Sequence, residues 1–299
     1  MRIALVQIAL CIALAGCANA PEKHAAAPAP TTAPPPTSTG PEPNDNLNAL
    51  AWAQTAIEHD LVYREVFRDA GEKLRIALKD ARWDALPKNE RKHPLSPKLK
   101  PAVIVDIDET VLDNSPYQAR LVEQDKEFDE SSWLAWCREK RAKALPGALE
   151  FAQAAARRGV TVFYISNRAQ DLNEATLENL RAVGFPIADN ETVFLGLGTV
   201  VDGCAQNGTS KGCRRELVGR THRVLMQFGD QIGDFADVPS NTPDGRRAAM
   251  APYAGWIGER WFVLPNPTYG SWESSLVDND WTRPAAARRA AKRNALRIE

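Results

Sequence analysis

Five short apolar runs alternate with stretches of helical spacing, and this alternation restricts the fold more than any other feature of the sequence. Each run is four to six residues long and is consistent with a strand buried on both faces. The runs are Ala102–Val105, Val160–Ile165, Thr192–Leu195, Val224–Phe228 and Trp261–Leu264. The helical stretches between them are Ala148–Arg158, Leu172–Val183 and Cys213–Arg220. Strands that alternate with helices predict an α/β fold, in which helices cover both faces of a mainly parallel sheet.

A helical segment precedes the first of these strands. Apolar residues recur at three- and four-residue steps from Leu50 to Leu78, with charged residues between them. This spacing predicts one or two amphipathic helices. The chain has 299 residues, 44% of them hydrophobic and 25% charged, which suits one large α/β domain with a small helical addition.

Polar and charged residues directly follow the predicted strands, at the edge where parallel α/β sheets bind ligands. They are Asp106 and Asp108 after the first strand, Ser166 and Asn167 after the second, Asp230 and Asp234 after the fourth, and Lys211 at the head of the helix before it. Carboxylates this close together repel one another unless a cation or phosphoryl chemistry uses them. We therefore expect a cation and phosphate site at the carboxyl edge of the sheet.

Each of these features has a simpler interpretation when it is taken alone. An acidic cluster can cap the following helix, which would explain one aspartate but not the alternating pair Asp106 and Asp108. Lys211 can be a solvated surface charge, and a single serine at a strand end says little. Their occurrence together, at successive strand ends, favours the catalytic interpretation.

The order Asp-x-Asp-x-Thr, Ser, Lys and Gly-Asp-x-x-x-Asp resembles the haloacid dehalogenase (HAD) superfamily of phosphotransferases. Residues 105–115 (VDIDETVLDNS) and 263–273 (VLPNPTYGSWE) are similar to the class C acid phosphatases, the lipoprotein-anchored 5′-nucleotidase family. The resemblance extends from about residue 47 onward. It implies a haloacid-dehalogenase-like Rossmannoid parallel sheet with helices on both faces, plus a small, mostly helical region.

The resemblance also implies a role for each candidate residue. Asp106 would be the nucleophile that forms an aspartyl-phosphate, and Asp108 would protonate the leaving alcohol and then activate water. Ser166 and Lys211 would hold the phosphoryl oxygens and offset their charge, with Asn167 also binding substrate. The implied reaction is that of an acid phosphatase, a phosphoric monoester hydrolase.

The resemblance also implies Mg²⁺ as the cofactor, a cation that prefers hard oxygen ligands. The resemblance places the ion on the side chain of Asp106, the backbone carbonyl of Asp108 and Asp230. Asp234 is expected to be a supporting carboxylate of the same metal site.

Aromatic residues suggest the substrate. In relatives of this family a Trp and a Tyr at the positions of Trp133 and Tyr269 stack on the nucleobase, and any base offers a flat face for stacking. The implied substrates are nucleoside monophosphates, with other phosphomonoesters accepted. Trp136 and Trp272 repeat the same three-residue spacing and fit either the core or the clamp.

The first 45 residues predict a secretory signal followed by a lipid anchor and a linker. Residues 1–16 have the pattern of a secretory signal, and the Leu-Ala-Gly-Cys string that ends at Cys17 is similar to a bacterial lipobox. Lipid on Cys17 would anchor the chain, and the Pro-rich residues 17–45 would be an extended linker to an acid phosphatase domain at 46–299. By resemblance to Gram-negative lipoproteins, the absence of Asp after Cys17 implies the outer membrane, with the domain facing the periplasm or the cell surface.

Composition excludes some functions and leaves others open. Lys plus Arg is 37 and Asp plus Glu is 38, a net charge of −1, so no general basic field exists for nucleic-acid binding. A phosphotransferase to alcohols and a lipoprotein that binds nucleotide or haem without turnover are the alternative functions. A homodimer is compatible with the sequence.

The cysteines that remain after Cys11 and Cys17 give a further expectation. Cys204 and Cys213 lie nine residues apart and would pair in an oxidising compartment, which leaves Cys137 free. A zinc site is disfavoured because the chain has no Cys-x-x-Cys and its histidines are scattered. The Arg- and Ala-rich C-terminal tail predicts a solvated surface helix, with contact to anionic lipid as the alternative.

Overall fold

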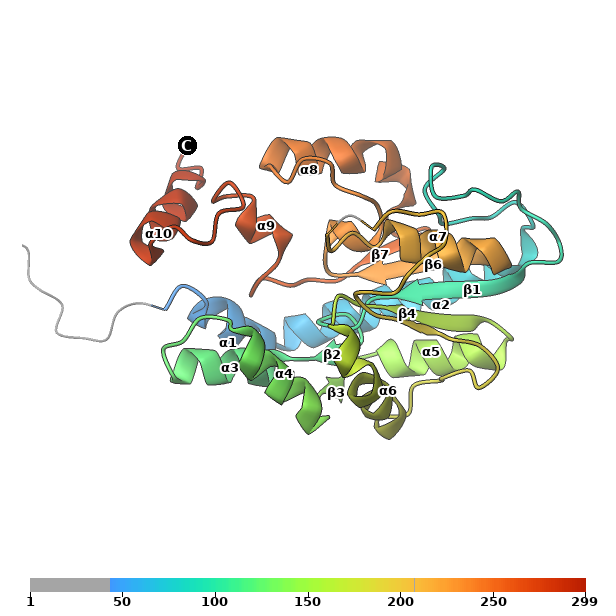
Figure 1. The fold of residues 1–299 in the computed structure, drawn as a ribbon, viewed down its shortest axis with the longest axis horizontal. Helices are drawn as coiled ribbons and strands as arrows, with labels where there is room; N and C mark the ends of the chain where they lie inside the picture. Colours follow the sequence, from blue (N-terminus) through green and yellow to red (C-terminus); the bar gives the residue numbers. More distant parts are fainter. Residues whose placement is uncertain (1–43, 207) are drawn as a thin grey trace, which may run out of the picture. The chain divides into compact units, whose positions relative to one another are not determined.

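One five-stranded sheet forms the centre of the computed structural model, which describes residues 44–206 and 208–299. The strand order is β5-β4-β1-β6-β7, and each neighbouring pair is parallel. The strands are β1 Lys100–Val105, β4 Thr161–Ile165, β5 Phe194–Leu195, β6 His222–Gly229 and β7 Trp261–Val263 (Figure 1). Each of the five predicted runs overlaps a strand, and the predicted α/β parallel sheet is confirmed.

The register of the sheet brings the ends of its central strands together. Val105 at the end of β1 pairs with Tyr164 on one side and with Phe228 on the other. The residues that follow β1, β4 and β6 are therefore neighbours in space although they lie far apart in the sequence. The candidate site is built at this edge.

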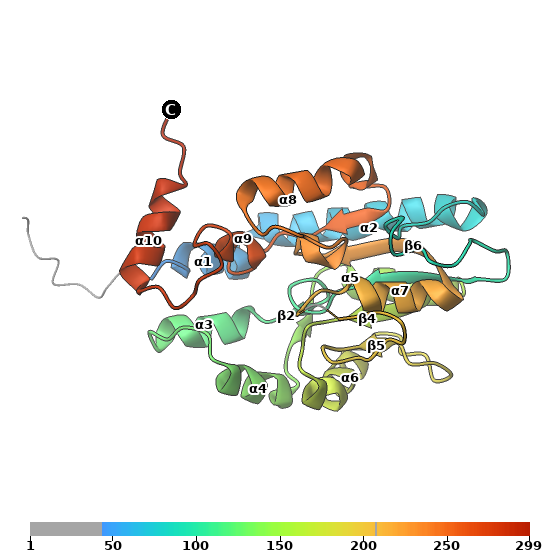
Figure 2. The same cartoon turned by 45° about the horizontal axis from the view of Figure 1, so that its top comes forward.

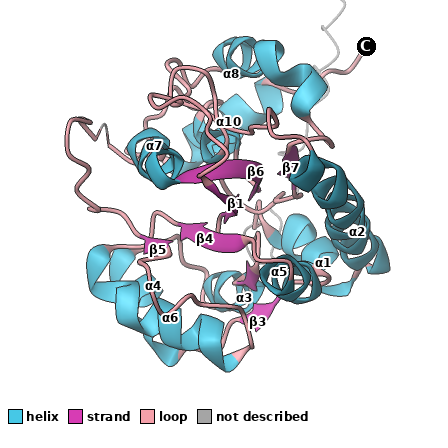
Figure 3. Ribbon diagram, turned by 90° about the vertical axis from the view of Figure 1, so that its right-hand side faces the viewer, coloured by secondary structure: helices cyan, strands magenta, loops and turns pink. Residues whose placement is uncertain are grey.

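Helices cover both faces of the sheet, as predicted (Figure 3). Helices α2 (Ile57–Lys79) and α5 (Ala148–Arg157) pack on one face, where Phe67 of α2 and Phe151 of α5 contact Phe228 of β6. Helix α7 (Gly212–Thr221) packs against β4 and β6 from the other face. Burial on both sides is the reason that these strands are continuous apolar runs.

A small region lies beyond the carboxyl ends of the strands (Figures 1 and 2). It contains α1 (Leu47–Thr55), α3 (Ser115–Glu123) and α4 (Glu130–Glu139). A short antiparallel pair, β2 (Leu112–Asp113) with β3 (Lys143–Ala144), joins it to the sheet. The mostly helical region implied by the resemblance is therefore present. Its β2–β3 pair was not predicted, because two-residue strands carry no periodicity.

The remaining helices are α6 (Asn173–Ala182), α8 (Pro243–Met250), α9 (Ser271–Ser274) and α10 (Ala285–Asn294). Helix α10 is the predicted C-terminal helix, but the expectation that it is simply solvated is wrong at Arg288. That side chain is buried, and it forms an ion pair with Glu127. Arg289 and Lys292 of the same helix form ion pairs with Asp45, so α10 is attached to the segment that leads into α1.

The cysteine expectations hold for the described residues. Cys204 and Cys213 form a disulfide, and Cys137 is a free, buried thiol. In the described part of the chain, no helix combines the length and the apolar character that a membrane span requires. The predicted signal at residues 1–16, the predicted lipidation of Cys17 and the predicted linker up to residue 43 lie outside the described residues.

Candidate active site

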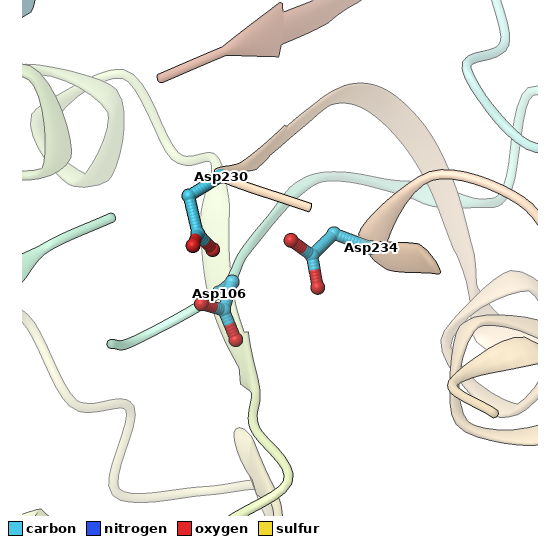
Figure 4. Close-up of side chains that lie close together, drawn as sticks. All are labelled: Asp106, Asp230 and Asp234. Atoms are coloured by element: carbon cyan, nitrogen blue, oxygen red, sulfur yellow. The ribbon is translucent and has the colours of Figure 1, made fainter. Parts of the chain in front are cut away.

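Three predicted aspartates converge at the carboxyl edge of the sheet. Asp106 follows β1 and extends its ladder, because its backbone N–H donates to the carbonyl of Phe228 at 3.0 Å. Asp230 directly follows β6, and Asp234 ends the next short turn. One carboxylate oxygen from each lies within 4.8 Å of the others, and Figure 4 shows the three groups facing a common point. We call Asp106, Asp230 and Asp234 the carboxylate triad.

Lys211 is the cation of the site. It caps the N-terminus of α7, and its ammonium contacts Asp106 and lies 2.7 Å from Asp234. Burial alone would lower the pKa of Lys211, but the carboxylates of Asp106 and Asp234 raise it above its ordinary value. The side chain is therefore held in its charged form between two carboxylates, where it can also meet a phosphoryl oxygen.

The carboxylate triad carries more negative charge than Lys211 balances. Burial raises the pKa of Asp106 well above its ordinary value, with the other triad carboxylates adding to the shift against the opposing effect of Lys211. Burial, with Asp234 second, raises the pKa of Asp230 to about 7. Three hard oxygen donors with uncompensated charge are a donor set that fits a divalent cation such as Mg²⁺.

Neighbouring polar groups fix the orientation of the triad. Asn266 and Gln231 each donate to Asp230 Oδ2 at 2.8 Å, and the backbone N–H of Gln231 donates to Asp234 Oδ2 at 2.9 Å. A Cβ at Gly229 would collide with the Asp234 side chain, so only glycine allows that carboxylate so close to the strand end.

The raised pKa of Asp230 predicts that Asp230→Asn stabilises the metal-free protein. A folded pKa of about 7, against an ordinary 3.8, means that ionisation of this carboxyl opposes folding. The stability associated with its protonated form is fully present below the ordinary pKa and is lost as the pH rises through about 7. In EDTA at pH 8, urea unfolding should give the variant a free energy of unfolding about 1–3 kcal/mol above wild type. At pH 4 the difference should vanish, and a variant of equal or lower stability at pH 8 would contradict the prediction.

Asp108 and Ser166 lie next to the triad and contact each other. Ser166 Oγ is 3.3 Å from Asp108 Oδ2, and the serine is fully buried. The Asp108 side chain is 18% exposed and also accepts hydrogen bonds from Asn114 and Arg168. The predicted acid therefore lies at the site with one part of its carboxylate accessible.

Helix α7 holds the loops around the site through two buried arginines. Arg214 donates to the carbonyl of Ser166 at 2.6 Å and to Asn167 Oδ1 at 2.6 Å. Arg215 donates to the carbonyls of Gly233 and Asp234 while forming a double hydrogen bond with Glu90. One helix thus supports Lys211, the loop after β4 and the turn after β6. Asn167 is exposed, and its side-chain oxygen is used by Arg214.

The predicted aromatic residues have different surroundings. Trp133 is half-buried beside Tyr117, with the Arg168 guanidinium 5.5 Å from the centre of its ring. Tyr269 is also half-buried, and its carbonyl accepts from Trp272 Nε1 at 3.1 Å. The described ring contacts of Trp133 do not include Tyr269, so their joint clamp stays a prediction. Trp136 is 3% exposed and belongs to the core.

Sequence reasoning missed Asn114, Arg168, Arg214 and Arg215. All four lie within or beside stretches that carried the prediction, yet their spacing gave no sign of their contacts. Long side chains reach partners that are distant in the sequence, and Arg168 binds Asp108 from 60 residues away. Adjacency to a predicted strand end is the signal that would have selected Arg168.

Comparison with known proteins agrees with this geometry. Residues 78–272 match the family described as HAD superfamily, subfamily IIIB (acid phosphatase). The chain is 32% identical to a class C acid phosphatase from Bacillus anthracis of known structure, with a TM-score of 0.71, covering 85% of this chain and 97% of that one. The same protein with tungstate bound gives 33% identity and a TM-score of 0.72 over the same shares.

More distant relatives are plant proteins. Acid phosphatase 1 of Solanum lycopersicum is 27% identical over 166 residues, which is 56% of this chain and 57% of that protein. Vegetative storage protein 1 of Arabidopsis thaliana is 27% identical over 167 residues, or 56% and 54% of the two chains. The chain thus spans a little over half the length of these two relatives.

Proposed function

Because this chain belongs to the acid phosphatases of subfamily IIIB of the HAD superfamily, we propose that it is a Mg²⁺-dependent phosphomonoesterase that works through an aspartyl-phosphate. The observation that carries the proposal is the placement of Asp106 and Lys211 in one buried cluster with Asp108 beside them. A nucleophile, a cation and an acid at one strand edge are the parts that phosphoryl transfer needs.

In the first half of the reaction, a carboxylate oxygen of Asp106 attacks the phosphorus of the ester. A bond forms between that oxygen and phosphorus, and the bond from phosphorus to the leaving oxygen breaks. Its electron pair stays on the leaving oxygen, which takes a proton from the Asp108 carboxyl. Lys211 and Ser166 offset the charge of the phosphoryl oxygens as the transition state forms.

In the second half, water attacks the phosphorus of the aspartyl-phosphate. Asp108, now a carboxylate, takes a proton from that water, and the bond between phosphorus and Asp106 breaks. Inorganic phosphate leaves, and both aspartates return to their starting protonation states. Asp108 therefore serves as acid and base in turn, while Thr110 Oγ1, 3.3 Å from Asp106 Oδ2, helps to orient the nucleophile.

The carboxylate triad and the backbone carbonyl of Asp108 are the groups that would hold Mg²⁺. A bound divalent cation supplies charge neutralisation between the carboxylates and the phosphoryl oxygens. Lys211 already occupies one side of Asp106 and Asp234, so Asp230 offers the carboxylate that Lys211 does not contact.

The proposed substrates are nucleoside 5′-monophosphates, with other phosphomonoesters accepted. Support comes from the aromatic group of Tyr117, Phe128 and Trp133 on helices α3 and α4 and the segment between them. Phe128 is 59% exposed, so this group offers ring surface to solvent next to the residue that binds Asp108. A flat ring surface suits any nucleobase.

Phosphate release by the full chain tests the proposed function. We expect Mg²⁺-dependent release from a nucleoside 5′-monophosphate and from phenyl phosphate. Release from neither substrate by a folded protein would contradict the hydrolase and favour a nucleotide- or haem-binding lipoprotein. An added alcohol that captures the phosphoryl group as a new ester would identify a phosphotransferase instead.

Trp133→Ala should reduce the preference for nucleotides. Loss of one stacking surface should lower kcat/KM for a nucleoside monophosphate about 10-fold, within the ~1–3 kcal/mol of a base–aromatic stack. Glycerol phosphate, which has no ring, should be hydrolysed at nearly the wild-type rate. Trp281→Ala is the matched control, because Trp281 is 48% exposed on the segment before α10. Equal losses on both substrates would argue against stacking by Trp133.

We further propose that lipid on Cys17 anchors the enzyme to the outer membrane. The support is the sequence of residues 1–45 alone. Metabolic labelling with a radioactive fatty acid should mark the wild type and not Cys17→Ser.

A further inference from the structure

Arg168 is a buried charge that the proposed mechanism does not use. It follows Ser166 and Asn167 in the loop after β4, and its side chain is 1% exposed. Its Nη2 and Nε lie 2.7 and 3.0 Å from Asp108 Oδ1, while Nη1 donates to Thr176 Oγ1 at 3.2 Å. A buried arginine with its partners fixed in this way is a rigid support for a carboxylate.

Asn114 supports the same oxygen of Asp108, and its own Oδ1 lies 3.4 Å from Arg168 Nη2. The indole Nε1–H of Trp136 can only donate, and it donates to Asn114 Oδ1 at 2.8 Å. The Asn114 amide must therefore present its NH₂ group to Asp108, and Nδ2 lies 2.9 Å from Asp108 Oδ1. A flipped amide would set two donors against each other at the Trp136 end, so the buried tryptophan determines the orientation.

The two carboxylate oxygens of Asp108 consequently differ in the number and length of the hydrogen bonds that they accept. Oδ1 accepts three close donors, at 2.7, 2.9 and 3.0 Å. Among the described residues, Oδ2 has only two contacts, both longer, from Ser166 Oγ and Arg168 Nε at 3.3 Å. Hydrogen bonds weaken as they lengthen beyond about 3.2 Å. Oδ2 is therefore the oxygen that can still form a further strong hydrogen bond.

We propose that Arg168 and Asn114 are positioning residues that hold Asp108 by Oδ1 and so present Oδ2 to the leaving oxygen. The inference rests on the proposed function and deepens it. In the first half-reaction the proton passes from Oδ2 to the leaving oxygen as the bond from phosphorus to that oxygen breaks. Trp136 acts on Asp108 indirectly, because it orients Asn114.

A positioning role has a signature that general loss of structure lacks. The 4-nitrophenolate ion leaves without help from an acid, whereas phenolate is a stronger base and gains more from a proton. Phenyl phosphate and 4-nitrophenyl phosphate share one ring and differ in this respect. Their kcat/KM values report the steps up to phenol release and not the later attack by water.

The decisive comparison is Arg168→Gln with the wild type on these two substrates. We expect kcat/KM for phenyl phosphate to fall about 100-fold, within the ~10²–10⁴ range of general acid catalysis, and that for 4-nitrophenyl phosphate to fall less than about fivefold. Arg168→Lys keeps the charge but loses the double contact with Asp108. Its kcat/KM for phenyl phosphate should therefore lie between those of the wild type and Arg168→Gln. Equal losses on both substrates would overturn the positioning role.

Asp108→Asn provides the matched control. It should show the same bias between substrates, and the double variant with Arg168→Gln should be little worse than Asp108→Asn alone, because both changes remove one function. Losses that multiply in the double variant would show that Arg168 acts elsewhere.

A second variant keeps the test decisive if Arg168→Gln does not fold. Trp136→Phe retains a ring beneath Arg120 but removes the N–H that orients Asn114. The ratio of the two substrates should shift in the same direction by about two- to tenfold, the worth of one hydrogen bond. An unchanged ratio in this folded variant would overturn the role of Asn114 and Trp136. A wild type inactive on both substrates would contradict the proposed function itself, whereas an active wild type with unbiased variants would contradict only the inference.

Discussion

Asp106→Asn is expected to lower phosphate release by at least about 10⁴-fold while the protein stays folded. The amide has the shape of the carboxylate but lacks the charge that makes its oxygen a nucleophile. Lys211 keeps Asp234 as a partner, so the substitution does not leave the buried ammonium unpaired. Phosphate release and circular dichroism, measured on the same preparation, check both halves of the expectation.

Asp84→Asn is the matched control for this prediction. Asp84 is another aspartate with little exposure, at 12%, and it is ion-paired with Arg91. It lies near the opposite end of the sheet, because the next residue, Ala85, bonds to Val224 early in β6. The variant can lose stability, but its rate per folded molecule should stay within about threefold of wild type, since surroundings distant from the reacting atoms contribute little. A folded Asp106→Asn protein with substantial turnover would remove Asp106 from the role of nucleophile.

Removal of divalent metal should also abolish the phosphatase activity. Without a cation, the carboxylate triad and the incoming phosphate repel each other, and a metal ion is worth several kcal/mol in the transition state, or about 10³-fold or more in rate. Dialysis against EDTA should abolish phosphate release, and added Mg²⁺ should restore it. Full activity after exhaustive chelation would contradict a metal-dependent reaction.

A second readout separates metal binding from catalysis. A ligand that binds only the folded state raises the unfolding temperature, by the equivalent of about 2.7 kcal/mol at 100 times its Kd. Mg²⁺ should therefore raise the unfolding temperature of the wild type, and the shift should shrink in Asp230→Asn. A shift of the same size in both proteins would place the ion away from the triad.

The residues behind these two predictions are recognisable from their positions in the sequence. Asp106 and Asp230 each follow an apolar run, and the carboxyl ends of parallel strands meet at one edge. Lys211 is recognisable only as one member of a set, because a single lysine before a helix has no distinctive pattern. The disulfide between Cys204 and Cys213 follows from their separation and the expected compartment.

The orientation of the side chains could not be predicted in the same way. No periodicity indicates that Arg168 binds Asp108, that Trp136 orients Asn114, or that Arg288 is buried against Glu127. Each contact joins segments that come together only after the chain has folded, and each depends on the rotamer of a long or planar side chain.

The sequence by itself therefore determined the fold class, the strand order along the chain and the chemical groups at the strand ends. It could do so because burial on both faces requires unbroken apolar strands and because parallel connections align their ends. The tertiary structure alone decided which oxygen of Asp108 is held and which is free. That distinction depends on differences of a few tenths of an ångström among the distances from Asn114, Ser166 and Arg168 to the two oxygens of Asp108. Such differences are set by side-chain packing rather than by any local sequence pattern.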